Sequence, residues 1–345
     1  MKRLNLLLSA FLLLFPKSLL YSNPYSNLLD YVRQDLANNI LIFLPQRIKS
    51  NLLELCSKLS KLEKTYELNK AETAYSIFTW IQRNIYYECS QSQEYNKTPD
   101  IIFKAGKGTP NEISFLFKTM CNHLEIEAGI IPGYIKFYKN IETNREWNYI
   151  KFNNTYYLID VSMGVCIYDE EVELSYYDYF YFGAKPEMLI RSHFPKEIKW
   201  QLLNNPISLK QFLSMASLTH WFYIYGFKTV SPDSFLINDK FINFNLTFDG
   251  TFIYKYIECV YSDFFGKENT IKCKYNLISD KTMNFIINSI SEKMNYISIY
   301  VGGYNPTIYY NTYICRILSF KIDLKNDDYS LSKDNNYFEN HITFK

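Results

Sequence analysis

The sequence predicts an α+β fold, with a helix packed on an antiparallel sheet, followed by a C-terminal β-sandwich. Three observations lead to this prediction. An amphipathic helical pattern begins at Thr109, two strand-forming runs flank Asn153 and Asn154, and short strand patterns separated by turns fill the chain from about Tyr223 onward. A helix followed by consecutive antiparallel strands is typical of α+β layers, and many short strands between turns are typical of a sandwich.

Helical patterns occupy the first part of the chain. Residues 28–62 are expected to be mainly helical with a break near Pro45, a second helix to run over 71–86, and a polar loop to follow over 88–98. Thr109 suits a helix N-cap, Pro110 the first helical position, and Glu112 completes a capping box. The apolar residues that follow are spaced to bury one face of this helix: Ile113, Leu116, Phe117, Met120, Cys121 and Leu124.

Strand patterns follow that helix. Strands are expected over 130–138 and 147–161, the second span being a hairpin that turns at Asn153 and Asn154, and later over 241–248, 252–261, 295–300 and 309–320. A linker is expected over 212–219. The predicted organisation is a signal peptide at 1–22, a helical region at 23–70, an α+β domain at 71–215, a β-sandwich at 216–322 and a polar tail at 323–345.

Composition excludes several classes of function. The chain of 345 residues has 37 basic and 35 acidic residues without a basic tract, so no nucleic-acid partner is expected. The seven cysteines show no metal-like spacing, and we expect neither a metal nor a cofactor. Cys259 and Cys273 are a candidate disulfide in an oxidising compartment, while buried free thiols are the alternative.

The N-terminus has the features of a secretory signal peptide. Lys2 and Arg3 precede an apolar run from Leu4 to Phe15, and the small residue Ser22 suits a cleavage site. The alternative is an uncleaved membrane anchor. After removal of the signal no membrane span is expected, so the predicted location is secreted, periplasmic or in the cell envelope.

Several motifs occur in an order that resembles the transglutaminase-like superfamily, and within it the kyphoscoliosis-peptidase-like branch. The matching segments are Trp80–Tyr87, Gly108–Pro110, Arg145–Asn148, Leu158–Val161, His193–Pro195 and Trp200–Leu203. This resemblance implies a papain/transglutaminase-like core. It also implies a catalytic triad in which a cysteine at a helix N-terminus is the nucleophile, a histidine the base, and an aspartate orients the histidine.

Two of the three triad positions hold residues that are unsuited to that chemistry. By position, the nucleophile site is Pro110, the base site is Arg145 and the aspartate site is Asp160. Proline carries no nucleophile, and a guanidinium stays protonated. We expect Arg145 to form an ion pair with Asp160, because a turn at Asn153 and Asn154 would make them diagonal neighbours across the hairpin.

Other cysteines and histidines could in principle replace the missing nucleophile and base. Cys121 lies on the apolar helix stripe and is interpreted as core, and His123 points off that stripe towards solvent. Cys89 and Cys166 follow segments that border the site, so either is a candidate relocated nucleophile.

Two aromatic features have alternative interpretations. Trp147 either lines the active-site cleft or packs in the hydrophobic core, and we favour the core. The tyrosine-rich run at 176–181 forms a recognition surface or packs against strands.

The sequence therefore predicts a secreted, catalytically inactive transglutaminase-like protein that binds or scaffolds a protein or peptide. The alternative is an active cysteine hydrolase or acyltransferase of the same fold that uses a relocated cysteine such as Cys89 or Cys166.

Overall fold

A computed structural model describes residues 27–45, 47, 50–88, 97–137, 140–164, 179–233, 241–249, 253–263, 265–288, 290, 294–304 and 315–321. The predicted signal peptide at 1–22, the polar tail at 323–345, Cys89 and Cys166 lie outside these residues, as does most of the loop predicted over 88–98.

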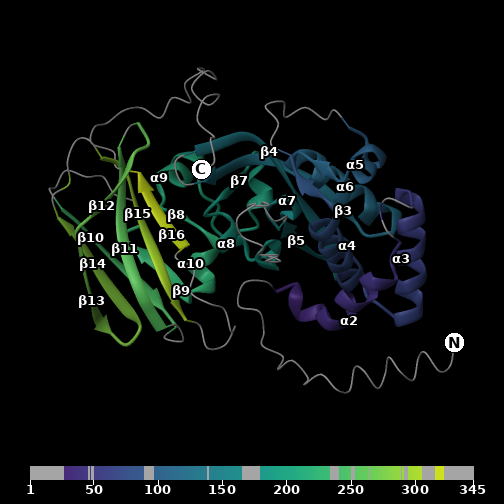
Figure 1. Ribbon diagram of the computed structural model, residues 1–345, viewed down its shortest axis with the longest axis horizontal. Coiled ribbons are helices and arrows are strands. Elements are labelled where there is room, and N and C mark those ends of the chain that lie inside the picture. The colour runs from purple at the N-terminus through teal and green to yellow at the C-terminus, as the bar shows by residue number, and fades with distance from the viewer. Residues whose placement is uncertain are drawn as a thin grey trace.

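The helices of the first half form one layer (Figure 1). The described helices before the sheet are η1 (Leu29–Tyr31), α2 (Gln34–Asn39), η2 (Ile40–Phe43), α3 (Leu52–Tyr66), α4 (Lys70–Asn84), α5 (Pro99–Ala105) and α6 (Pro110–His123). Helices α3, α4 and α6 all begin with a capping box, in which a polar N-cap side chain and a glutamate satisfy backbone donors of the first turn. The predicted break near Pro45 and the predicted second helix are confirmed.

An antiparallel five-stranded sheet lies against this layer, in the order β6-β5-β4-β3-β7. Its strands are β3 (Ala128–Phe137), β4 (Asn140–Phe152), β5 (Thr155–Ile159), β6 (Phe182–Ala184) and β7 (His193–Pro195). The turn from β4 to β5 falls at Asn153 and Asn154, whose φ angles of 47° and 59° are left-handed. Asparagine tolerates this conformation and both positions of a type I′ turn require it, so the predicted hairpin is confirmed.

The strand predicted to reach Val161 is shorter than expected. Strand β5 ends at Ile159, and Val161 begins the short helix α7 (Val161–Gly164). The cause is Asp160, whose Oδ1 accepts a hydrogen bond from the Met163 backbone N–H at 3.0 Å and so stabilises the start of a helical turn.

Helix α6 packs on the sheet through the stripe that its sequence predicts. The six stripe residues Ile113, Leu116, Phe117, Met120, Cys121 and Leu124 are at most 3% exposed. Asn148 of β4 donates to the backbone carbonyls of Ser114 and Gly129 at 3.0 and 3.2 Å, which joins helix, β4 and β3. The sheet and the helix therefore form one core.

Two short strands, β1 (Tyr86–Tyr87) and β2 (Lys107–Gly108), pair in parallel between α4 and α6. Short helices that follow β5 lead to the C-terminal strands: η4 (Tyr179–Tyr181), α8 (Pro186–Leu189), η5 (Ile198–Gln201), α9 (Leu209–Ser214) and α10 (His220–Ile224). Phe180 and Tyr181 are 5% and 4% exposed. These two side chains of the tyrosine-rich run thus pack inward instead of forming a recognition surface.

The C-terminal region is a β-sandwich of two antiparallel sheets, in the orders β13-β14-β10-β9 and β12-β11-β15-β16-β8. Its strands are β8 (Ser217–Leu218), β9 (Phe227–Ser231), β10 (Phe241–Phe248), β11 (Ile253–Asp263), β12 (Glu268–Ile271), β13 (Cys273–Ser279), β14 (Thr282–Asn288), β15 (Met294–Tyr304) and β16 (Cys315–Lys321). Buried rings from the two sheets meet, as in the Phe244–Phe320 pair with centroids 5.2 Å apart. The sandwich is confirmed, although β12, β13 and β14 were not among the predicted strands.

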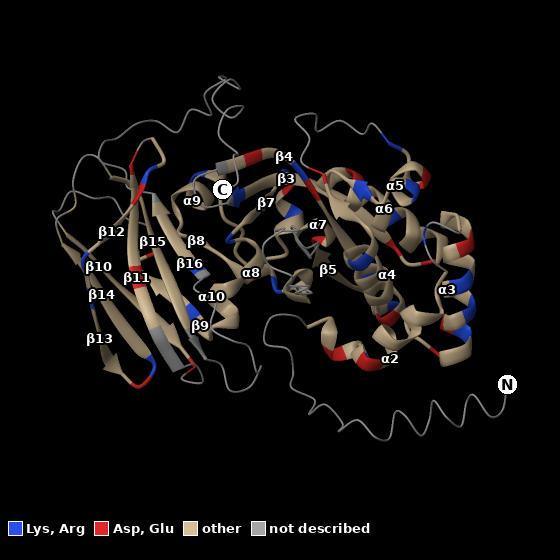
Figure 2. Cartoon of the chain, in the orientation of Figure 1, with Lys and Arg blue, Asp and Glu red and all other residues tan. Residues whose placement is uncertain are grey.

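Charged residues of both signs are interspersed over the elements (Figure 2). Among the described residues, no helix is long and apolar enough to cross a membrane.

Candidate functional site

The three positions that the family resemblance singles out meet where α6 abuts β4. Pro110 is the first residue of α6, Arg145 lies in β4, and Asp160 directly follows β5. Asn111 fastens the helix start to β4 on both sides of Arg145, because its side chain donates to the Asn144 carbonyl at 2.9 Å and accepts from the Glu146 N–H at 3.0 Å. These two hydrogen bonds of Asn111 therefore hold the N-terminus of α6 against β4.

Arg145 is buried, with a side chain only 4% exposed. Its Nη1 pairs with Glu142 at 3.0 Å, its Nη2 donates to the Ser162 hydroxyl at 3.2 Å, and its guanidinium carbon lies 5.9 Å from the centre of the Tyr87 ring. The guanidinium thus fills the space between β4, the start of α7 and β1.

Arg145 reaches Asp160 through Ser162, which corrects the expected direct ion pair. The Ser162 hydroxyl accepts from Arg145 and donates to Asp160 Oδ1 at 2.5 Å. Both charged side chains are buried on the same side of the site, as the hairpin register requires. The second carboxylate oxygen is occupied by a histidine.

That histidine is His193, which the sequence did not place next to Asp160. Its Nε2 lies 3.0 Å from Asp160 Oδ2, and both side chains are fully buried. His193 belongs to β7, three strands from β5 in the sheet order, so the sheet must curl to bring the two together. The only signal for it in the sequence is its place in the His193–Pro195 segment of the family resemblance.

Burial and neighbouring charges act in opposite directions on the two ionised groups. Burial alone would raise the pKa of Asp160, but the hydrogen bond from His193, the charges of His193 and Arg145, and the Ser162 hydroxyl together hold that pKa below its ordinary value. Burial would lower the pKa of Arg145, but the negative charges of Asp160 and Glu142 raise it overall. The site therefore holds a carboxylate and a guanidinium that stay ionised.

Ser192, His193 and Asp160 form a hydrogen-bonded chain of the residue types found in a serine triad. The Ser192 hydroxyl lies 2.7 Å from His193 Nδ1. However, the imidazole is fully buried, and the Ser192 N–H donates to the Leu189 carbonyl at 3.0 Å, so it is not available to stabilise an oxyanion. We interpret the chain as a structural network that satisfies both ring nitrogens of a buried histidine.

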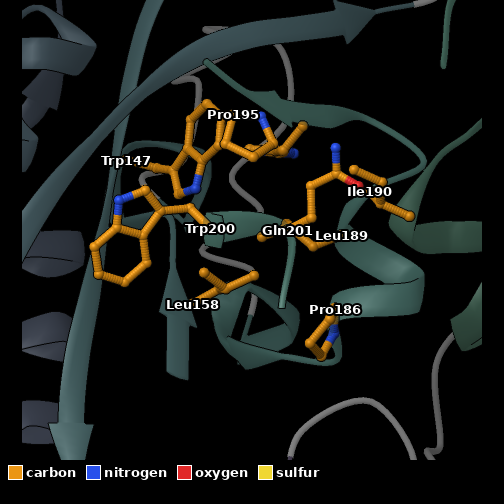
Figure 3. A pocket seen from close by; sticks show the side chains of 9 residues that line it. Trp147, Leu158, Pro186, Leu189, Ile190, Pro195, Trp200 and Gln201 are labelled. Carbon is orange, nitrogen blue, oxygen red and sulfur yellow. The ribbon is translucent and has the colours of Figure 1, made fainter. Parts of the chain in front are cut away.

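A small pocket, with room for about one water molecule, lies beside His193, between β4, β5, α8 and η5. Its walls are mainly apolar, and Figure 3 shows Trp147 and Trp200 next to each other on one side of it. Trp147 is 1% exposed and meets the His193 ring edge to face at 5.1 Å. Trp147 is therefore a core aromatic, as favoured from the sequence. Gly133 makes room for it, since a Cβ there would lie 2.2 Å from the indole ring.

The thiols in the described part of the chain do not approach this site. Cys121 is fully buried in α6 beside Cys56, and burial raises the pKa of each. His123 is exposed. The interpretations of Cys121 as core and His123 as a surface residue are confirmed. Among the described residues, no group of three or more His, Cys, Asp or Glu side chains is placed to hold a metal ion.

Comparison with known proteins confirms the resemblance drawn from the motifs. Residues 60–161 match the sequence profile of the transglutaminase-like superfamily. Mouse kyphoscoliosis peptidase is 28% identical over 202 residues, which cover 55% of this chain and 30% of the mouse protein. Cytokinesis protein 3 of Schizosaccharomyces pombe is 25% identical over 161 residues, covering 44% of this chain and 18% of the yeast protein. Hillarin of Drosophila melanogaster is 24% identical over 183 residues, covering 47% of this chain and 22% of the fly protein.

The matched part is a minority of each relative. The chain spans less than a third of the length of these curated proteins. The likeness covers the α4 to α7 region, in which the three candidate triad positions lie.

Proposed function

We propose that this chain, which carries a transglutaminase-like domain of the kyphoscoliosis-peptidase branch, is a catalytically inactive member of that superfamily that binds or scaffolds a protein or peptide. Catalysis by a thiol triad needs a nucleophile, a mobile proton acceptor and a carboxylate free to orient it. Pro110 and Arg145 provide neither of the first two.

The observation that carries this proposal is that hydrogen bonds occupy both carboxylate oxygens of Asp160. Both of its carboxylate oxygens are engaged, one by His193 and the other by Ser162 and the Met163 N–H. His193 and Ser162 are buried, so a catalytic imidazole at position 145 would have to displace an existing network. The arrangement suits a stabilising role for this carboxylate.

The aromatic side chains around Trp200 support a binding role. Trp200 is partly exposed and packs against Tyr149 and Tyr156 with ring centroids 4.2 and 5.4 Å away, and aromatic clusters of this kind are common where proteins bind peptides. One relative is named for cytokinesis and not for an enzymatic activity. These features favour a protein or peptide as the partner.

Thiol reactivity tests the loss of catalysis. The native protein is treated with iodoacetamide at pH 6.5 and the labelled positions are mapped by mass spectrometry over time. We expect slow labelling of every cysteine except Cys273, which is partly exposed in the sandwich, with the buried Cys56 and Cys121 as internal slow references and the urea-unfolded chain as the fast one. Rapid labelling of Cys89 or Cys166 at this pH would contradict the proposal.

The same experiment addresses the alternative of an active cysteine hydrolase or acyltransferase. Cys89 and Cys166 lie outside the described residues, so no geometry argues for or against them here. If either is the rapidly labelled residue, its serine variant should lose both the labelling and any ester hydrolysis, and the alternative replaces the proposal.

Binding is tested separately with displayed peptides selected on the immobilised protein. We expect peptides with an apolar anchor, and we expect their binding to weaken at least tenfold in Trp200→Ala but not in His123→Ala, an exposed control. Peptides that bind both variants equally would place recognition elsewhere and contradict a role for Trp200 in binding.

We further propose that the protein acts in a secreted, periplasmic or envelope location. The charged, apolar and small-residue segments of positions 1–22 support this. N-terminal sequencing of the mature chain should start close to Asn23; a mature chain that retains Met1 to Phe15 would contradict it.

A further inference from the structure

Two cysteines lie where the two sheets of the sandwich are joined. Cys259 lies in β11 and pairs with Ile271 of β12 in one sheet. Cys273 begins β13 and pairs with Ile287 of β14 in the other sheet. Only Lys272 separates β12 from β13, so the chain crosses from sheet to sheet next to both cysteines.

The register brings the two cysteines close together, because Cys259 pairs with Ile271, two residues before Cys273. Cys259 is 1% exposed, and Cys273 is partly exposed with its thiol donating to the Lys274 carbonyl at 3.6 Å. Both are free thiols in this structure. Interaction with Cys273, together with burial, raises the pKa of Cys259, and interaction with Cys259 lowers the pKa of Cys273. Cys273 is thus both the more accessible sulfur and the one that ionises first.

Cys273 lies on an edge strand. β13 is the edge of its sheet, and β12, which pairs with the strand of Cys259, is the edge of the other. Apart from the partly buried Cys273, every residue of β13 is exposed, including Tyr275 at 48% and Leu277 at 62%. Little side-chain packing therefore fixes this edge, and a covalent link at its first residue would have a large local effect.

We propose that Cys259 and Cys273 are a redox site at which a reversible disulfide fastens the two sheets of the sandwich. The oxidant is a disulfide, such as a small-molecule thiol in its oxidised form. The Cys273 thiolate attacks one sulfur of the oxidant, forms a mixed disulfide and releases the other half as a thiolate. Cys259 then loses its proton and attacks the Cys273 sulfur, forming the protein disulfide and expelling the second thiolate. The protein loses two electrons and two protons, and the oxidant becomes two thiols.

The link would close a loop of about 15 residues at a corner of the sandwich. Closing a loop of this size restricts the unfolded chain enough to raise the unfolding temperature of a domain of this size by roughly 10 °C. The effect should be confined to the transition of the sandwich.

Differential alkylation of the full chain tests the proposal. The reduced protein is equilibrated with oxidised glutathione, its free thiols are blocked, and disulfide-linked peptides are identified by mass spectrometry. We expect a peptide linking residues 259 and 273, while Cys56 and Cys121, a second pair of buried neighbouring thiols, stay reduced. A stable glutathione adduct on Cys273 without the link, or two cysteines that remain reduced, would overturn the proposal.

A stability measurement separates the link from a general effect of the oxidant. The unfolding temperature is compared in oxidised and reduced samples of the wild type, Cys273→Ser and Cys56→Ser. We expect the rise of roughly 10 °C in the wild type and in Cys56→Ser, and its loss in Cys273→Ser. A rise that persists in Cys273→Ser would refute the assignment, and Cys273 is partly exposed, so this variant is expected to fold.

Discussion

Replacing His193 by alanine should strongly destabilise the α+β domain, although this residue has no assigned place in the catalytic chemistry of the family. The fully buried imidazole provides a hydrogen bond to the Asp160 carboxylate at 3.0 Å and an edge contact with Trp147 at 5.1 Å. A hydrogen bond to a charged group contributes about 1.5–3 kcal/mol and an aromatic edge contact about 0.5–1.5 kcal/mol. Because the carboxylate would also lose a partner in a buried site, the expected cost of His193→Ala is about 3–5 kcal/mol.

The assay is equilibrium unfolding in urea followed by tryptophan fluorescence, with the transition of the α+β domain fitted separately from that of the sandwich. A double-mutant cycle with Asp160→Asn isolates the pair, and its coupling energy at pH 7 should be about 2 kcal/mol or more. His123→Ala is the matched control, because this histidine is exposed and its loss should change stability by less than about 0.5 kcal/mol.

The pH dependence of this coupling follows from Asp160. Its pKa in the folded protein is lowered, so its contribution to stability is present above the ordinary carboxyl pKa and is lost as the pH falls through the folded value. The coupling should therefore shrink in acid. A coupling below about 0.5 kcal/mol at pH 7, or a His193→Ala cost as small as that of the control, would refute a structural role for the pair.

Three further predictions concern separate parts of the molecule. Burial lowers the pKa of Lys136 to about 7, with the charge of Arg191 adding to this shift and that of Asp233 opposing it. Between about pH 7 and 10.5 the unfolded chain therefore binds more protons than the folded one, so the free energy of unfolding should rise with pH. Lys136→Met should flatten this rise, as measured by urea unfolding from pH 7 to 10. Thr109→Ala should cost about 1 kcal/mol by removing the side-chain acceptor at the start of α6, as measured in urea, and a cost near zero would count against the capping box. Pro110→Cys should introduce a thiol that iodoacetamide labels faster than Cys121, because position 110 is partly exposed at a helix N-terminus; equal rates, measured by mass mapping, would show that the position is closed to reagents.

Local patterns predicted the elements of the α+β domain well, because each pattern there depends on nearby residues. The Thr109 capping box, the apolar stripe behind it and the Asn153–Asn154 turn all involve contacts within a few positions. The register of β4 and β5 follows from that turn, and with it the closeness of Arg145 and Asp160. Strand β13 was missed because it lies at a sheet edge with mostly exposed side chains, so its sequence lacks a strict alternation of apolar and polar residues. Strand β14 was missed although Met283, Phe285 and Ile287 alternate with outward-facing residues.

The part of the site that escaped prediction depends on a contact between distant segments. His193 is 33 positions from Asp160, and their contact depends on how the sheet curls, which no local spacing specifies. The expected ion pair at Asp160 rested on the hairpin turn, which makes Arg145 its diagonal neighbour, and a buried carboxylate does need a partner. Within the hairpin, Arg145 was the available cation. The fold provides these partners through His193 of β7 and through Ser162, which connects Asp160 to Arg145. The network therefore gives Asp160 a structural role that does not depend on a nucleophile.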